Sequence, residues 1–190
     1  MADRMMNTGT FKPSLKQRIY EFLGGGTIIR YLIHLRKTEY YHGKNKLLYL
    51  YHLCQYRSLG RNLGFSIGLN TLGYGVVIPH YGTIVVGSPA KLGNYCVLHT
   101  STCITGNNKT IGDALYLSSG AKITSPVTLG NNISVGANSL VNKSFPEGGI
   151  MIGGMPAHFI KDTQPWYIRD GEYYNTLHEK VEDLRKKFIG

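Results

Sequence analysis

The sequence predicts a mainly β fold: a left-handed parallel β-helix of six-residue repeats, preceded by short helices and followed by one C-terminal helix. Three observations predict it. Aliphatic residues recur every six positions through the middle of the chain, glycine directly follows half of them, and helix-compatible periodicity is confined to the two ends. A period of six matches neither the 3.6 of an α-helix nor the 2 of a plain strand.

Twelve aliphatic residues define the repeat, six apart except for one step of eight and one of seven. They are Leu72, Ile78, Val86, Leu92, Leu98, Ile104, Ile111, Leu117, Ile123, Leu129, Val135 and Val141. This period fits a triangular solenoid in which each side is one short strand, each corner is one turn and each aliphatic side chain points inward. A β-sandwich with coincidental spacing is the alternative, but alternating strands would not keep phase over twelve steps.

Small and turn-forming residues occupy the remaining repeat positions. The position four after the aliphatic is often small, as at Ala90, Cys96, Thr102, Ala121 and Ser139. Glycines follow the aliphatics at Gly73, Gly87, Gly93, Gly112, Gly130 and Gly136. Glycine and asparagine accept a left-handed backbone, so we expect that conformation at these glycines and at Asn107, Asn108, Asn131 and Asn132.

Three regions follow from these patterns: a basic helical segment over 1–63, the β-helix over 64–160 and a C-terminal extension with a helix over 161–190. Two or three amphipathic helices are expected in the first region, one of them capped by Ser14. In the last region Asn175 is expected to cap a helix that packs against the prism and pairs Glu182 with Lys186. Its apolar face would comprise Leu177, Val181, Leu184 and Phe188.

The charge is concentrated at one end. The formal net charge is +10, and residues 1–61 hold eleven Lys or Arg against three acids. Such a segment suits an acidic partner, whether a phosphorylated cofactor, an anionic sugar, a membrane surface or nucleic acid; the alternative is a solvated basic face. Three cysteines without CxxC spacing predict neither a disulfide framework nor a zinc site and favour the cytoplasm. We expect no signal peptide and no membrane span.

Three segments carry a family likeness, and together they extend over roughly residues 65–160. IPHYGTIVVGSPAKLGNYCVL, LSSGAKITSPVTLGNNISVGANSLV and GGMPA resemble the catalytic coil, the acetyl-CoA-binding coils and the closing motif of the hexapeptide-repeat acyltransferases, in their serine-acetyltransferase-like branch. The resemblance implies a homotrimer with active sites shared between subunits. It also implies direct acetyl transfer from acetyl-CoA to a hydroxyl, without an acyl-enzyme and without a metal.

The sequence departs from true serine acetyltransferases at several positions. Pro79 stands where an aspartate precedes the catalytic histidine, and Phe65 and Ser66 stand nearest to a second aspartate that orients the imidazole. The loop ITGNNKTIG is short and lacks a histidine. With these departures the chain resembles the small acetyltransferases of capsule and exopolysaccharide synthesis. We therefore expect a sugar hydroxyl as acceptor, no nucleic acid partner, and a role near membrane-bound glycan synthesis.

His80 is the expected catalytic base, because the resemblance places it at the family's histidine position and imidazole titrates near neutral pH. It lies beside the eight-residue step, and irregularities in a regular solenoid often mark sites. The alternative for His80 is an ordinary surface histidine. His99, Tyr81 and Asn108 are expected to bind substrate, although a histidine at a corner can simply face solvent. Cys96 and Cys103 are not expected to act as nucleophiles.

The resemblance also implies a cofactor groove along one edge of the prism. The expected cofactor-binding residues are Ser119, Gly120, Ala121, Ala137, Lys143 and Lys161. The small residues would let pantetheine approach the backbone, and the lysines would meet CoA phosphates. For each lysine the alternative is a role in solubility.

Three other functions compete with the expected one. Serine O-acetylation in cysteine biosynthesis is the principal alternative. A zinc lyase would need three converging histidines, but His80 and His99 lie nineteen apart and no third lies in the repeats. A non-catalytic β-helix scaffold is the last.

Overall fold

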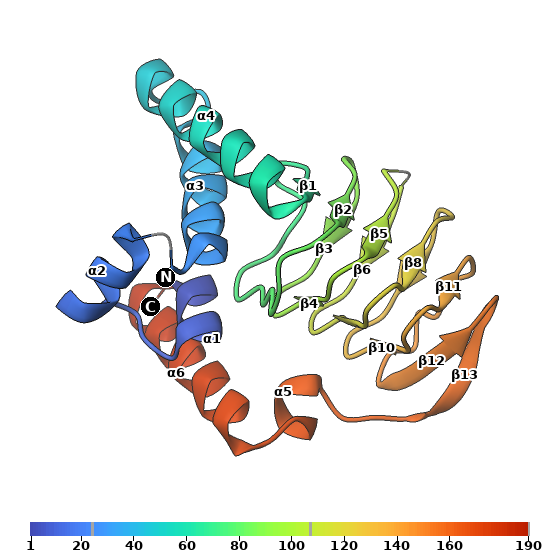
Figure 1. The fold of residues 1–190 in the computed structure, drawn as a ribbon. Coiled ribbons are helices and arrows are strands. Elements are labelled where there is room, and N and C mark those ends of the chain that lie inside the picture. Colours follow the sequence, from blue (N-terminus) through green and yellow to red (C-terminus); the bar gives the residue numbers. More distant parts are fainter. Residues whose placement is uncertain (24, 107, 190) are drawn as a thin grey trace.

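The computed structural model describes residues 1–23, 25–106 and 108–189, and for Phe22, Phe188 and Ile189 the backbone only. The expected positions at Asn107 and the Phe188 side chain therefore lie outside the described residues. In these described ranges the chain forms thirteen strands and six helices, and Figure 1 shows the β-helix between two groups of helices. The predicted left-handed parallel β-helix with flanking helices is confirmed.

The β-helix has three faces, each a ladder of short strands. Face A contains β1 (Phe65–Ile67), β2 (Ile84–Val86), β5 (Thr102–Ile104), β8 (Lys122–Ile123) and β11 (Leu140–Val141). Face B contains β3 (Lys91–Leu92), β6 (Thr110–Ile111) and β9 (Thr128–Leu129). Face C contains β4 (Val97–Leu98), β7 (Tyr116–Leu117), β10 (Ser134–Val135), β12 (Ile150–Gly154) and β13 (Ala157–Asp162). The chain visits A, B and C in turn, and all pairs are parallel except β12 with β13.

The core is the stack of repeat aliphatics inside the prism. All twelve are buried, and those of neighbouring coils stand in register, as Leu98 does with Leu117 and Leu117 with Val135. The small residues at the fourth position are buried as well, at Ala90, Cys96, Thr102, Ala121 and Ser139. Burial of this continuous apolar column is the main stabilisation of the fold.

The repeat glycines serve close packing of coils rather than a left-handed backbone. None of the six glycines that follow an aliphatic has a positive φ. A Cβ on Gly93 would lie 2.6 Å from the carbonyl carbon of Gly112, and a Cβ on Gly112 would lie 2.7 Å from that of Gly130. The left-handed conformation occurs instead at Asn70, Tyr95, Ser101, Ala114, Gly120, Asn132 and Asn138, among other positions. The expectation is therefore right for Asn132 and wrong for the six glycines.

Asn131 also differs from its expected role. Its φ is not positive, and its side-chain oxygen accepts a hydrogen bond of 2.8 Å from the backbone N–H of Asp113 on the neighbouring coil. Asp113 repeats the pattern by accepting from the backbone N–H of Asn94 at 2.7 Å. These polar side chains lie at the corners between faces B and C, where they accept hydrogen bonds from backbone N–H groups that the turns leave free.

The helices α1 (Ala2–Thr8), α2 (Leu15–Phe22), α3 (Thr27–Tyr41) and α4 (Lys46–Leu63) precede the prism. Ser14 caps α2, as predicted, and the structure adds a complete capping box with Gln17. Figure 1 shows α3 and α4 as an antiparallel hairpin standing off the first coil, with α4 leading straight into β1. The sequence did not indicate α1, whose Asp3 accepts a bond of 2.7 Å from Arg36 Nε.

The C-terminal extension runs back along the prism to the N-terminal helices (Figure 1). It contains α5 (Trp166–Arg169) and α6 (Glu172–Ile189). Leu177 and Val181 of α6 are buried against Val77 and Tyr95, so the expected packing on the prism is confirmed.

Two details of the predicted C-terminal helix are wrong. Asn175 lies inside α6, because the helix begins at Glu172. Glu182 does not pair with Lys186: its carboxylate accepts from the hydroxyls of Tyr74 and Tyr95 and from Arg185. Lys186 lies 3.8 Å from Asp183 instead. Tertiary partners on the prism have overridden the local pair.

The α3–α4 hairpin contains a closely spaced pair of histidines, His34 and His52. His34 Nδ1 and His52 Nδ1 lie 2.9 Å apart, so one ring donates to the other and both cannot be protonated. Burial, and then the charges of His52, Lys37 and Arg30, lower the pKa of His34 to about 4. In the unfolded chain His34 is protonated below about pH 6.5, whereas in the folded chain it is protonated only below about pH 4.

We therefore expect the free energy of unfolding to fall by about 1 kcal/mol or more as the pH drops from 6.5 to 4. Urea titrations across this range would measure the loss. The variant His34→Gln should flatten the slope, whereas His158→Gln, at an exposed histidine, should leave it unchanged. An unchanged slope in His34→Gln would assign the pH dependence to other groups.

Candidate active site

One edge of the prism collects most of the predicted site residues. The edge lies between faces C and A, and on successive coils it is formed by residues 79–83, 99–101, 118–121 and 136–139. We call it the C–A edge. The predicted residues on it are His80, Tyr81, His99, Ser119, Gly120, Ala121 and Ala137. Residues spread over almost sixty positions of sequence thus lie along one line, since each coil returns the chain to the same edge.

His80 sits in an enlarged corner. Five residues, 79–83, separate Ile78 from β2, whereas three, 99–101, make the same turn on the next coil. The backbone N–H of Gly82 donates to Leu63 O at 2.9 Å, which fixes this corner to the end of α4. His80 is exposed, and within the described residues nothing hydrogen-bonds to its imidazole. The eight-residue step in the sequence is therefore a loop that presents His80 to solvent.

His99 lies one coil further along the same edge and is held in place. Its Nε2 is 2.9 Å from the hydroxyl of Tyr116, and the guanidinium of Arg169 lies 4.6 Å from the centre of the Tyr116 ring. Burial lowers the pKa of His99, and the nearby His80 lowers it further. Both effects favour the neutral form of the His99 imidazole.

The small residues expected to bind cofactor expose backbone along the C–A edge. Ser119 and Ala137 are exposed, and Gly120 has a φ of 75°. A Cβ on Gly120 would lie 2.0 Å from the side-chain Oδ1 of Asn138, so any larger residue here would have to displace that side chain. Ala121 is fully buried under the edge, so its methyl group packs inside the prism.

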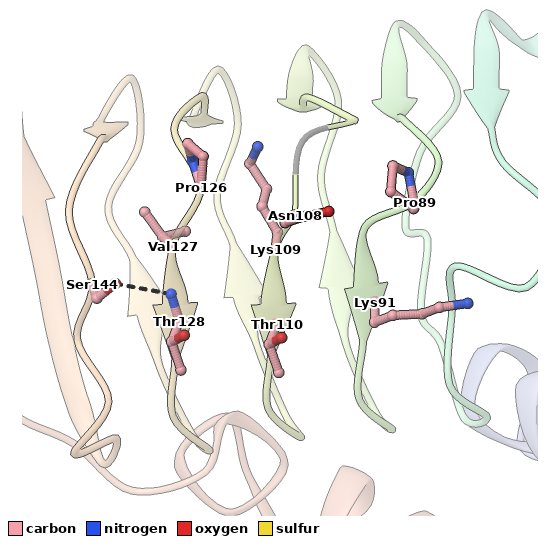
Figure 2. A pocket seen from close by; sticks show the side chains of 9 residues that line it. All are labelled: Pro89, Lys91, Asn108, Lys109, Thr110, Pro126, Val127, Thr128 and Ser144. Atoms are coloured by element: carbon pink, nitrogen blue, oxygen red, sulfur yellow. Dashed lines mark hydrogen bonds between the residues drawn. The ribbon is translucent and has the colours of Figure 1, made fainter.

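Three predicted residues lie elsewhere. Asn108 and Lys143 are exposed at the edge between faces A and B, and Lys161 is exposed on β13 beside Met151 of β12. Asn108 borders a groove of about 490 Å³ that crosses β3, β6 and β9 (Figure 2). Within one chain, then, the structure does not bring Asn108 or Lys143 to His80.

Three side chains near these sites were not anticipated. Tyr116 hydrogen-bonds to His99 and lies seventeen positions after it. This spacing is close to the length of one coil, so the repeat could have revealed the pair. Arg169 comes from α5, outside the repeats, and nothing in the periodicity points to it. Lys109 is buried in the A–B edge, where its ammonium donates to Thr105 Oγ1 at 2.8 Å, and burial lowers its pKa.

All three cysteines are free, and burial raises the pKa of Cys96 to about 12, so its thiol stays protonated. Across 1–23, 25–106 and 108–189 no group of three or more His, Cys, Asp or Glu could hold a metal ion. Over the same ranges no helix is both long and apolar enough to cross a membrane.

Comparison with known proteins points in one direction. No family model matches the sequence. The serine acetyltransferase of Staphylococcus xylosus is 25% identical over 126 residues, which cover 61% of this chain and 58% of that protein. The serine acetyltransferase of Mycobacterium tuberculosis is 28% identical over 101 residues, covering 50% of this chain and 44% of the relative. These relatives are serine acetyltransferases. This chain spans about half the length of the curated relatives it matches.

Solved structures agree with the sequence comparison. Serine acetyltransferase of Neisseria gonorrhoeae superimposes with a TM-score of 0.61 and 25% identity, covering 86% of this chain and 65% of that one. The soybean apoenzyme gives a TM-score of 0.66 at 20% identity over 84% of this chain and 66% of its own. A serine acetyltransferase in complex with CoA gives a TM-score of 0.57 at 22% identity, covering 70% of this chain and 55% of that one. The shared fold is the β-helix described above.

The expected sugar acceptor is wrong. The relatives and structural neighbours reported above are all serine acetyltransferases, which favours the alternative acceptor, serine, over a capsule or exopolysaccharide sugar. The expectation rested on missing features: no aspartate at Pro79, none at Phe65 or Ser66, and a short loop. An absent side chain removes one means of binding serine, but it supplies no group that would recognise a sugar.

Proposed function

We propose that this chain is an acetyl-CoA-dependent O-acetyltransferase whose acceptor is the hydroxyl of serine. One observation carries the proposal: His80, His99 and the small-residue corners of the following coils share a single edge, in the fold of the serine acetyltransferases. That edge offers an exposed base at one end and accessible backbone along its length.

The reaction needs a base, an oxyanion site and a cofactor groove. His80 takes the proton of the serine hydroxyl as its oxygen attacks the thioester carbonyl, and returns a proton to the departing CoA thiolate. Neutral His99, fixed by Tyr116, orients the acceptor beside His80. Backbone N–H groups of the neighbouring coils hold the developing oxyanion. Tyr81, which is 75% exposed next to His80, contacts the acceptor.

The pantetheine arm lies against the corners at Ser119, Gly120 and Ala137, where no large side chain keeps it from the backbone. Lys161, on the β12–β13 hairpin, contacts the phosphates of CoA. Asn108 and Lys143, on the A–B edge, serve the site of an adjoining subunit, because triangular prisms packed in threes place one subunit's edge against the next. The protein is accordingly proposed to be a homotrimer, which light scattering would report as about 63 kDa, three times the chain mass of 21.1 kDa.

The acceptor can be tested directly with the purified full chain. We expect acetyl-CoA and L-serine together to release free thiol, detected with a disulfide reagent, and to yield O-acetylserine by mass spectrometry. L-threonine and L-alanine serve as matched controls, since one adds a methyl group beside the hydroxyl and the other lacks the hydroxyl. Thiol release with serine that does not exceed release with alanine would exclude serine as the acceptor.

A further inference from the structure

The α2 helix turns its apolar side outward, contrary to the usual arrangement in a globular protein. Leu15 and Ile19 of α2 and Leu23, its C-cap residue, recur every four residues and so continue one stripe. Their side chains are 73%, 52% and 76% exposed. Figure 1 shows α2 at the outside of the N-terminal helices, away from the prism. A stripe of this kind, exposed on a helix that the rest of the fold leaves uncovered, marks an interaction surface.

The remaining sides of α2 fit the same interpretation. Glu21, on the side opposite the apolar stripe, forms an ion pair with Arg4 of α1, so the polar side faces the protein. At 100° per residue, Lys16 and Arg18 fall on the two flanks of the stripe. Lys12 precedes the helix, and all three basic side chains are exposed. An apolar stripe bordered by cations is typical of a helix that lies in the headgroup region of a membrane.

The charges around α2 favour an anionic surface. The acids of residues 1–61 are Asp3, Glu21 and Glu39, and each already pairs with Arg4 or Arg36. The other nine basic residues there have no carboxylate partner among the described residues. A symmetric contact between two copies of α2 would bring two such basic surfaces together without compensating acids. The charge therefore disfavours self-association through this helix and favours phosphate headgroups.

We propose that α2 docks the protein peripherally on a bilayer rich in anionic lipid, with Leu15, Ile19 and Leu23 inserted between headgroups and Lys12, Lys16 and Arg18 contacting their phosphates. The membrane-facing surface is separate from the C–A edge, so docking leaves His80 free. This inference does not depend on the acceptor.

Vesicle sedimentation with the full chain tests the proposal. The protein should partition onto vesicles of phosphatidylglycerol and phosphatidylcholine in equal parts, and at least tenfold less onto pure phosphatidylcholine. The variant Leu15→Ser/Ile19→Ser/Leu23→Ser should lose at least tenfold in partitioning. Its matched control, Leu47→Ser/Leu50→Ser/Tyr51→Ser, removes three exposed apolar side chains from α4 and should stay within threefold of the parent.

Charge is tested separately from apolar insertion. Lys12→Gln/Lys16→Gln/Arg18→Gln should also lose at least tenfold, whereas Lys180→Gln/Lys186→Gln/Lys187→Gln removes the same charge from α6 and should lose less than threefold. Circular dichroism of each variant shows that it is folded. Failure of the parent to bind anionic vesicles, or full binding by the α2 serine variant, would overturn the proposal. So would a loss of oligomer mass in that variant with unchanged vesicle binding, which would make α2 a contact between subunits.

Discussion

Replacing His80 with alanine is expected to lower kcat/KM for acetyl transfer to serine by a factor of about 10² to 10⁴, the usual contribution of a general base. The side chain is exposed, so its loss should not affect folding. Steady-state thiol release from acetyl-CoA, with the unfolding midpoint measured in parallel, would separate the chemical effect from a structural one.

A matched histidine variant makes this result specific. His42→Ala removes an imidazole from the far end of the α3–α4 hairpin, where its ring packs against Tyr49 at a centroid distance of 5.2 Å. It should change kcat/KM less than twofold. If His80→Ala retained more than a tenth of the parent activity, His80 could not be the base, and His99 would be the next imidazole on the edge to substitute.

Substituting Gly112 by alanine is expected to reduce the free energy of unfolding by about 3 kcal/mol or more, a large effect for a single methyl group. The added Cβ would lie 2.7 Å from the carbonyl carbon of Gly130 and 2.8 Å from the backbone nitrogen of Asn131. Both obstacles are main chain on the next coil, so relief requires the coils to separate and the parallel ladder to weaken. Urea unfolding monitored by circular dichroism would measure the loss.

Gly136 offers the control at the same repeat position. A Cβ there meets nothing closer than Ser139 Oγ at 3.4 Å, and its φ is not positive. Gly136→Ala should therefore change stability by less than about 1 kcal/mol, with a small gain because alanine restricts the unfolded chain. Equal losses in the two variants would show that coil spacing is not what selects glycine at this position.

The prism could be predicted from sequence because its order is local and periodic. Each aliphatic six positions on meets the same environment, so burial of Leu72 through Val141 follows from the repeat alone. The enlarged corner at His80 was visible for the same reason, as a step of eight in a series of sixes. Alignment of His99 with His80 along one edge also follows once the length of a coil is known.

Features that depend on distant or non-repeating partners could not be predicted. The α1 helix is short, and its place is fixed by Asp3 bonding to Arg36, which no local pattern reveals. Glu182 does not pair with Lys186 on its own helix, because its carboxylate accepts hydrogen bonds from Tyr74 and Tyr95 of the prism. The acceptor was missed for another reason: the recognised departures from serine acetyltransferases described what the site lacks, and specificity depends on the groups that a site contains.

The enlarged corner lies on the first coil and the β12–β13 hairpin on the fifth, with Ile78 and Ile152 in the corresponding strands of face C. Four coil steps separate them, which at about 4.8 Å per step is roughly 19 Å. The number of coils therefore sets the distance between the two along the prism axis. Adding or deleting one 18-residue coil would change the distance from His80 to the hairpin by about 4.8 Å, without altering either end. The length of an extended ligand that fits this edge is thus fixed by counting repeats, independently of the side chains that contact it.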